Sequence, residues 1–221
     1  MTQTKLNTTA YCLLGLFKKK PWTAYELAQF MEVSAVRTML PRTRSQIFNE
    51  PKKMAKQGLL SATEELQGNR KKTIYSITPL GEQTLADWLM EEGESPRVEH
   101  VSLLKFYLTS TADIPALLER IEEMRQQIMD EIKRSLILVD QILEHGTILG
   151  KTAPNASMIG LLGSHIFESR LLWLAECEEK LRALADTEDT TAMAVENYQQ
   201  TQQRLTTLLE KEKSRQKPAE K

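Results

Sequence analysis

The sequence has few of the features that mark secreted or membrane proteins. Its two cysteines, Cys12 and Cys177, lie far apart, so they indicate no disulfide framework, and a reducing compartment is the simplest expectation. No apolar run approaches the roughly 18 residues of a membrane helix. The apolar segment 10–17 is followed by Lys18, Lys19 and Lys20, whereas a signal peptide has its positive charge before the apolar segment. We therefore expect a cytoplasmic protein.

Residue patterns for catalysis and metal binding are also lacking. The three histidines, at 100, 145 and 165, have no cysteine or carboxylate at metal-ligand spacing. Ser164 and His165 are neighbours that would point to different faces of a helix, which argues against a hydrolase site. There is no glycine-rich phosphate loop and no paired-carboxylate motif. We expect no enzyme activity, no cofactor and no metal.

The composition is that of a folded protein. Hydrophobic residues make up 41% of the chain and charged residues 27%, with nine glycines and eight prolines, which excludes disordered and collagen-like chains. A length of 221 residues predicts one large domain or two small ones.

Charge is unevenly distributed along the chain. Residues 1–75 carry 13 Lys and Arg against five Glu, a net charge of +8, and the remainder carries a net charge of −9. This partition predicts that the first part meets a polyanion and that the acidic part faces away from it. The alternative is an ordinary fluctuation of surface charge, which the position of the basic residues in particular elements disfavours.

The first 90 residues predict helices followed by a hairpin. Apolar spacing indicates a first helix over residues 5–17, and Thr23 with Glu26 forms a capping box that begins a second. A third helix is expected from residue 42 or 43 to residue 57, with Gly58 as its C-cap. Pro51 falls inside it, so we expect either a bend there or a restart at Glu50.

The pattern then changes to strands. Residues 59–63 and 73–77 read as strands on either side of a turn at 67–69. Thr78 and Pro79 form a helix start, as N-cap and N1, for a helix that runs through Leu89. Residues 93–96 read as a linker. The order of three helices, a hairpin and a helix is that of a winged helix-turn-helix domain, in which the third helix enters the DNA major groove and the hairpin is the wing.

The rest of the chain is expected to be helical. Apolar residues from Leu117 to Leu143 recur at three- and four-residue steps, which predicts one helix of about thirty residues. A break over 146–155 precedes a second long helix that ends near Leu184. We expect a mostly α protein with a winged-helix domain at 1–92, a domain of antiparallel long helices for dimerisation at 98–213, and a disordered tail at 214–221.

Several segments together resemble the PadR family of transcriptional regulators. Residues 45–60 resemble the recognition helix, and segments 13–16, 23–27 and 68–81 resemble the first helix, the second helix and the wing. The acidic half resembles, more loosely, the dimerisation domain of the larger members. The resemblance implies that Ser45 and Gln46 approach DNA and that Tyr25 and the wing flank its backbone. Phe48 stands where the family commonly has Tyr, and Pro51 where it usually has an aliphatic residue.

These observations lead to one functional hypothesis. We expect a sequence-specific DNA-binding transcriptional regulator, a repressor, that acts as a homodimer on a palindromic operator. Whether a small-molecule effector controls it is left open. The alternative is a winged-helix module that binds protein instead of DNA, which the basic third helix and wing disfavour. The candidate DNA-binding residues are Tyr25, Arg42, Arg44, Ser45, Gln46, Phe48, Lys52, Lys53, Arg70, Lys71 and Lys72. The candidate dimerisation residues are Leu117, Ile121, Met124, Ile128, Ile132, Leu136, Val139, Ile166 and Trp173, the last of which could instead line an effector pocket.

Overall fold

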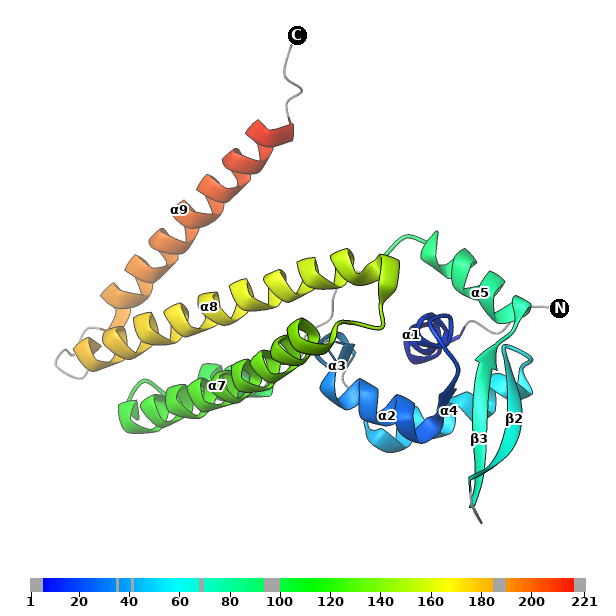
Figure 1. Ribbon diagram of the computed structural model, residues 1–221. Coiled ribbons are helices and arrows are strands. Elements are labelled where there is room, and N and C mark those ends of the chain that lie inside the picture. The colour runs from blue at the N-terminus through cyan, green and yellow to red at the C-terminus, as the bar shows by residue number, and fades with distance from the viewer. Residues whose placement is uncertain are drawn as a thin grey trace, which may run out of the picture. The chain divides into compact units, whose positions relative to one another are not determined.

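The computed structural model describes residues 6–34, 36–40, 42–67, 70–93, 100–184 and 190–216 (Figure 1). The chain divides into two compact units. One comprises Met1–Val98 with Asp130–Ile166, and the other Glu99–Met129 with Phe167–Lys221. The boundaries fall within two long helices, and each unit is described by itself below.

The N-terminal part of the chain is a winged helix-turn-helix domain, as the sequence predicts. Its helices and strands follow in the order α1 (Thr8–Phe17), β1 (Trp22–Thr23), α2 (Ala24–Val33), α3 (Val36–Met39), α4 (Arg44–Lys56), β2 (Leu60–Gln67), β3 (Arg70–Ile77) and α5 (Pro79–Leu89). The sheet has the order β1-β3-β2 and is antiparallel throughout. The register of the wing pairs Leu60 with Ile77 at its base and Gln67 with Arg70 at its outer end.

Side-chain caps determine where these helices begin. The Thr23 hydroxyl accepts a hydrogen bond from the Glu26 amide at 3.2 Å, and the Glu26 carboxylate accepts one from the Thr23 amide at 2.9 Å, which completes the predicted capping box. Thr78 caps α5, whose first residue is Pro79. Gly58 follows α4 with a φ of +76°, a conformation that favours glycine at the end of a helix.

Some details differ from the sequence-based expectation. Helix α1 begins at Thr8, later than predicted, because the Asn7 side chain caps it through the Ala10 amide. The short elements β1 and α3 were not predicted. Helix α4 does not restart at Glu50 but continues through Pro51, which is buried. The proline removes one hydrogen bond of the ladder, and its burial compensates for that loss. The predicted turn at 68–69 and linker at 94–96 lie outside the described residues.

The core of the winged helix forms around α1. Leu13 and Leu14 are completely buried, and Phe17 packs edge-on against Tyr75 of β3 at 6.4 Å between ring centroids. Leu27 of α2 and Met54 of α4 are also completely buried in this core. Burial of one such side chain contributes about 1.5–3 kcal/mol. Helix α4 packs against both α1 and α2 in this core.

Four helices follow in the described part of the chain, and the sequence predicted the two longest of them. The four are α6 (Val101–Leu108), α7 (Ile114–His145), α8 (Ala153–Leu184) and α9 (Thr190–Gln216), with a short 3-10 helix at Gly150–Thr152. Helix α7 has 32 residues, close to the predicted thirty. Helix α9 continues to Gln216 and so reaches three residues into the segment expected to be a disordered tail. Residues 217–221 lie outside the described part of the chain.

The first half of α7 and the second half of α8 pack within one unit. Leu117, Ile121, Met124 and Ile128 are buried there, as are Leu174, Leu181 and Leu184 of α8. The Arg125 guanidinium pairs with the Glu178 carboxylate at 2.5 Å, and Phe106 meets Trp173 edge-on. Helix α9 is bonded to α8 by side-chain contacts. Arg204 of α9 donates a hydrogen bond to the Glu176 carboxylate, and Lys180 donates one to the Asn197 side-chain oxygen of α9.

This packing corrects one expectation about dimerisation. The sequence suggests that a partner subunit buries the whole apolar stripe of α7. In the structure Leu117, Ile121, Met124 and Ile128 are already buried inside the protomer, because the chain folds its own helices against them. Ile132 is half-buried, and Leu136, Val139, Ile166 and Trp173 are exposed. The four buried residues of α7 therefore need no partner subunit for their burial.

The backbone at Leu59 comes very close to Gly81 of α5, and this close approach gives a test of the winged-helix packing. A Cβ at Gly81 would collide with the Leu59 carbonyl oxygen and lie 2.9 Å from Ile77 Cγ1. We expect Gly81→Ala to lower the free energy of unfolding by about 1–3 kcal/mol, because this overpacking forces α5 from the sheet. Chemical denaturation measures the change.

Gly15 provides the matched control. A Cβ there meets nothing within 4 Å, and the residue lies inside α1. Gly15→Ala should raise the free energy of unfolding by up to about 1 kcal/mol through helix propensity. Equal effects of the two substitutions would contradict this account of the packing.

Candidate nucleic-acid interface

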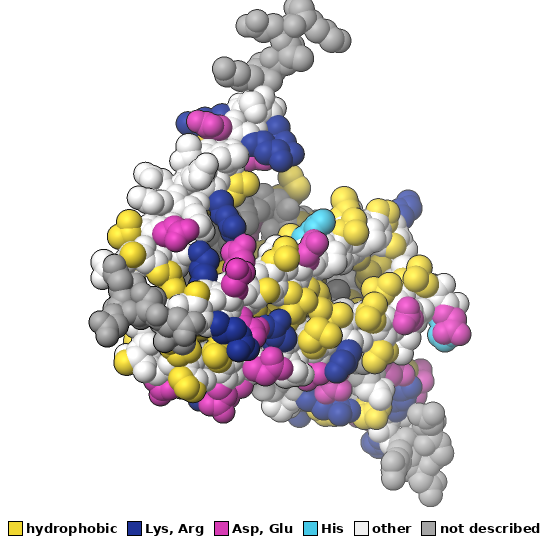
Figure 2. Space-filling model, turned by 90° about the vertical axis from the view of Figure 1, so that its left-hand side faces the viewer, with side chains coloured by type: hydrophobic (Ala, Val, Ile, Leu, Met, Phe, Trp, Pro, Cys, Tyr) yellow, Lys and Arg dark blue, Asp and Glu magenta, His cyan; other side chains and the backbone are white. Residues whose placement is uncertain are grey.

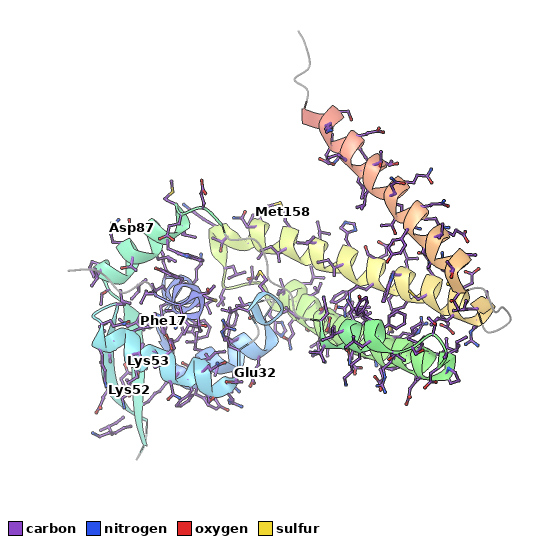
Figure 3. All side chains as sticks on the ribbon, turned by 180° about the vertical axis from the view of Figure 1, so that it is seen from behind. Phe17, Glu32, Lys52, Lys53, Asp87 and Met158 are labelled. Carbon is purple, nitrogen blue, oxygen red and sulfur yellow. The ribbon has the colours of Figure 1, made fainter. Side chains whose placement is uncertain are left out.

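Helix α4 has one face in the core and one in solvent. Ile47, Pro51 and Met54 are buried on the inner face. Opposite them, at steps of three and four residues, lies an exposed row that we call the outer row of α4: Ser45, Asn49, Lys52 and Lys56. With 3.6 residues per turn these four side chains share one side of the helix. Figure 3 shows Lys52 and, beside it, Lys53 on this helix.

Asn49 is a member of the outer row that the sequence reasoning missed. It lies one turn after Ser45 and is exposed. The spacing of four residues from a predicted contact was the signal that could have found it. Asparagine presents a donor and an acceptor together, which matches the major-groove edge of adenine. Lys56 was also not among the candidates chosen from the sequence.

An open polar depression lies beside the outer row. Its volume is about 410 Å³, and its lining joins the start of α1 to the first half of α4. The lining residues are Asn7, Thr9, Arg42, Ser45, Gln46, Asn49, Glu50 and Lys53. Polar groups from both helices therefore face the same solvent-filled space.

Two side-chain bridges in this region hold α4 against the first turn of α1. Arg42 Nε donates to the Thr9 hydroxyl at 2.9 Å. The side-chain nitrogen of Asn7, Nδ2, donates to Glu50 Oε1 at 3.0 Å. The side-chain oxygen of the same Asn7 caps α1. Arg42, which was predicted to contact DNA, is exposed and uses its Nε for the bond to Thr9.

Gln46 also has a structural task. Its side-chain oxygen accepts a hydrogen bond from the Thr43 amide at 2.9 Å, and the Thr43 hydroxyl accepts one from the Gln46 amide at 3.3 Å. The pair forms a second capping box, at the start of α4. The amide nitrogen of the Gln46 side chain takes no part in the capping box, and the residue is exposed.

Arg44 lies in a small cluster at the start of α4. Its guanidinium carbon lies 5.3 Å from the centre of the Tyr25 ring, and its nitrogen lies 3.9 Å from the Glu32 carboxylate. Such a stack restricts the guanidinium while leaving its donors available. Tyr25 and Phe48 are about half exposed, at 53% and 49%. The structure thus places Tyr25, Arg44 and Phe48 at the surface.

The wing brings basic side chains to β3. Lys71 pairs with Glu64 on the facing strand at 3.1 Å, and Lys72 pairs with Glu26 of α2 at 3.3 Å. Successive strand residues point to opposite faces, which explains why the two lysines find different partners. The side chain of Arg70 lies outside the described residues. Leu66, opposite Lys71, is 76% exposed.

Hydrogen bonding lowers the pKa of one of these carboxyls. The Thr23 backbone amide and then the Thr23 hydroxyl bond the Glu26 carboxylate, and Lys72 adds to them, so the pKa of Glu26 falls to about 2. In contrast, burial raises the pKa of the Cys12 thiol to about 11. Cys12 is partly buried and packs against the core.

Other kinds of site are not found in the described part of the chain. Among these residues no group of three His, Cys, Asp or Glu side chains could hold a metal ion. None of the helices described is long and apolar enough to cross a membrane.

The fold and the site define a class of protein, the winged-helix proteins with a long helical C-terminal half. No family model matches the sequence. A search of curated proteins finds the negative transcriptional regulator PadR of Bacillus subtilis, 29% identical over 107 residues. The alignment covers 48% of this chain and 58% of the length of that relative.

Solved structures extend the likeness over most of the chain. Bacillus subtilis PadR in complex with operator DNA has a TM-score of 0.66 at 19% identity, over 79% of this chain and 99% of the other. The PadR-like regulator BC1756 of Bacillus cereus has a TM-score of 0.65 at 14% identity, over 80% and 99%. Bacillus subtilis PadR in complex with p-coumaric acid has a TM-score of 0.62 at 17% identity, over 80% and 99%. The predicted PadR-like fold is confirmed, and the resemblance to the PadR family is supported by sequence and structure.

Proposed function

We propose that this chain is a PadR-family transcriptional regulator that binds duplex DNA. The outer row of α4 is the observation that carries the proposal. It places two short polar side chains, Ser45 and Asn49, before two lysines, Lys52 and Lys56, on one side of an exposed helix. Short polar groups can reach base edges in the major groove, while lysines pair with phosphates.

The wing and the start of α4 extend this surface. Arg44 and Tyr25 lie at one end of α4, and Lys71 and Lys72 lie on β3. In winged-helix proteins the hairpin touches DNA beside the groove that holds the recognition helix. The charge of +8 on residues 1–75 supports a polyanionic partner. Arg42 and Gln46 would act mainly by positioning α4.

We propose that the protein acts as a homodimer on a palindromic operator. One winged helix offers few base contacts, and two copies give useful specificity. Exposed apolar side chains on the second half of α7 and the first half of α8 support a partner surface (Figure 2). They include Leu136, Val139, Leu143, Met158, Leu161, Leu162 and Ile166. Repression is proposed because the Bacillus subtilis relative is a negative regulator.

We also propose a small aromatic acid as effector. Bacillus subtilis PadR has been solved with p-coumaric acid, and the fold is shared. In this chain Trp173 meets Phe106 at 5.9 Å between ring centroids, and Trp173 is 37% exposed. An effector changes DNA binding only if it binds one conformation of the protein better than another.

Removing the two lysines of the outer row tests DNA binding. We expect Lys52→Gln with Lys56→Gln to weaken binding to a mixed-sequence duplex of about three helical turns. Each lost phosphate contact should lower the magnitude of the log-affinity against log-salt slope by roughly 0.9. Fluorescence anisotropy across a salt series measures the affinity and the slope.

Lys18→Gln with Lys19→Gln is the matched control, since it removes the same charge at the end of α1, away from α4. It should leave the slope almost unchanged. Equal slopes for the wild type and the α4 variant would argue against this interface. Wild-type protein that does not bind duplex at low salt would favour the protein-interaction alternative.

A single charge on α7 tests the dimer. Leu136 is exposed on α7, and Gln141 lies about 140° around the same helix. Leu136→Asp should shift the protein from dimer to monomer in sedimentation equilibrium, because the charge would be buried without a partner. Gln141→Asp should leave the dimer intact. A dimeric Leu136→Asp variant would mean that the interface lies elsewhere.

The effector proposal is tested with p-coumaric acid in the same anisotropy assay. We expect the acid to release duplex from wild-type protein and to release less from Trp173→Phe. The acid should also quench the tryptophan fluorescence of the wild type more than that of the variant. Quenching without release of duplex would show a bound ligand that does not control DNA binding.

A further inference from the structure

The acidic side chains of the winged helix are placed beside its basic ones. Residues 1–75 contain five glutamates. Four of them pair with candidate DNA-binding residues: Glu26 with Lys72, Glu32 with Arg44, Glu50 with Lys53, and Glu64 with Lys71. Within the described residues no ion pair is found for Glu65, which is exposed on β2.

Two of the four carboxylates are fixed by the fold. One oxygen of Glu26 accepts hydrogen bonds from the Thr23 amide and hydroxyl, at 2.9 and 2.7 Å, and the other faces Lys72. One oxygen of Glu50 accepts a hydrogen bond from Asn7 at 3.0 Å, and the other faces Lys53 at 3.3 Å. In both cases one oxygen stabilises the fold and the second holds a lysine.

A fixed carboxylate competes with phosphate for its lysine. To reach a phosphate, Lys53 must leave Glu50, and the phosphate then approaches a carboxylate of like charge. The lysine also carries fewer mobile anions in the free protein, so fewer ions are released when DNA binds. Both effects weaken a contact that depends on charge alone.

From these contacts we infer that Glu50 and Glu26 are specificity-determining residues that act as built-in counterions for Lys53 and Lys72. The inference rests on the proposed DNA binding. Non-specific binding relies on phosphate contacts, whereas an operator adds base contacts through the outer row of α4. The two carboxylates therefore weaken binding to non-operator DNA by a larger factor than binding to an operator. As a result they raise the ratio of operator affinity to non-operator affinity.

Glu50→Gln and Glu26→Gln test this inference in the full chain. Glutamine keeps an oxygen that can accept from Asn7 or from the Thr23 amide, and it is also accepted in a capping box. Each variant should bind a mixed-sequence duplex about threefold more tightly, because the lysine no longer has to leave a carboxylate, a weak ion pair, to reach phosphate. The magnitude of the salt slope should rise by up to about 0.9. Thermal unfolding confirms that the variants are folded.

Glu82→Gln is the matched control, because it removes the same charge from an exposed residue of α5 for which no ion pair is found within the described residues. It should change the affinity much less. A double-mutant cycle gives a second control, since Glu50→Gln should bring no gain once Lys53→Gln is present. An equal gain in the Glu82 variant, or an undiminished gain without Lys53, would assign the effect to net charge and overturn the inference.

The outcomes also separate this inference from the proposed function. Wild-type protein that binds duplex with the same affinity and slope as Glu50→Gln and Glu26→Gln would overturn the inference and leave DNA binding standing. Wild-type protein that binds no duplex would overturn both.

Discussion

The seating of α4 on α1 is the constraint on which the rest of the site depends. Burial of Ile47, Pro51 and Met54 fixes which side of α4 faces the core, and therefore which side is free. The Asn7–Glu50 and Thr9–Arg42 hydrogen bonds add polar restraints at the first turn of α1. Apolar burial supplies most of the stability, and the directional bonds limit how α4 can rotate. Recognition of DNA by the outer row would follow from this packing.

Four of the basic residues proposed to bind DNA are held in ion pairs. A count of basic residues suggests an open cationic surface, but Arg44, Lys53, Lys71 and Lys72 each have a carboxylate within 4 Å. Exposed ion pairs are weak, so they do not prevent the lysines from reaching phosphate. They would make the electrostatic part of DNA binding smaller than the number of basic residues alone predicts. This leaves a larger share of the binding free energy to contacts that depend on base sequence.

The sequence predicted helix ends well, because capping residues, proline at a helix start and glycine at a helix end each act through their own local geometry. The capping box at Thr23, the Thr78–Pro79 helix start and the stop at Gly58 all appear as predicted. The sequence did not predict what tertiary packing decides. It could not show that Arg42 would bond Thr9, 33 residues earlier, or that the chain would bury half of the α7 stripe itself. Pro51 was judged by its cost to the helix alone, and its burial was not visible in the sequence.

The most direct test of this account is a structure of the full chain bound to a duplex selected from a random library. The account predicts that the outer row of α4 lies in the major groove, with Asn49 hydrogen-bonded to a base edge and Lys52 at a phosphate. It also predicts two copies of α4 about 34 Å apart, in successive turns of the groove. A complex in which the outer row faces solvent, or in which the protein touches DNA through another surface, would contradict it.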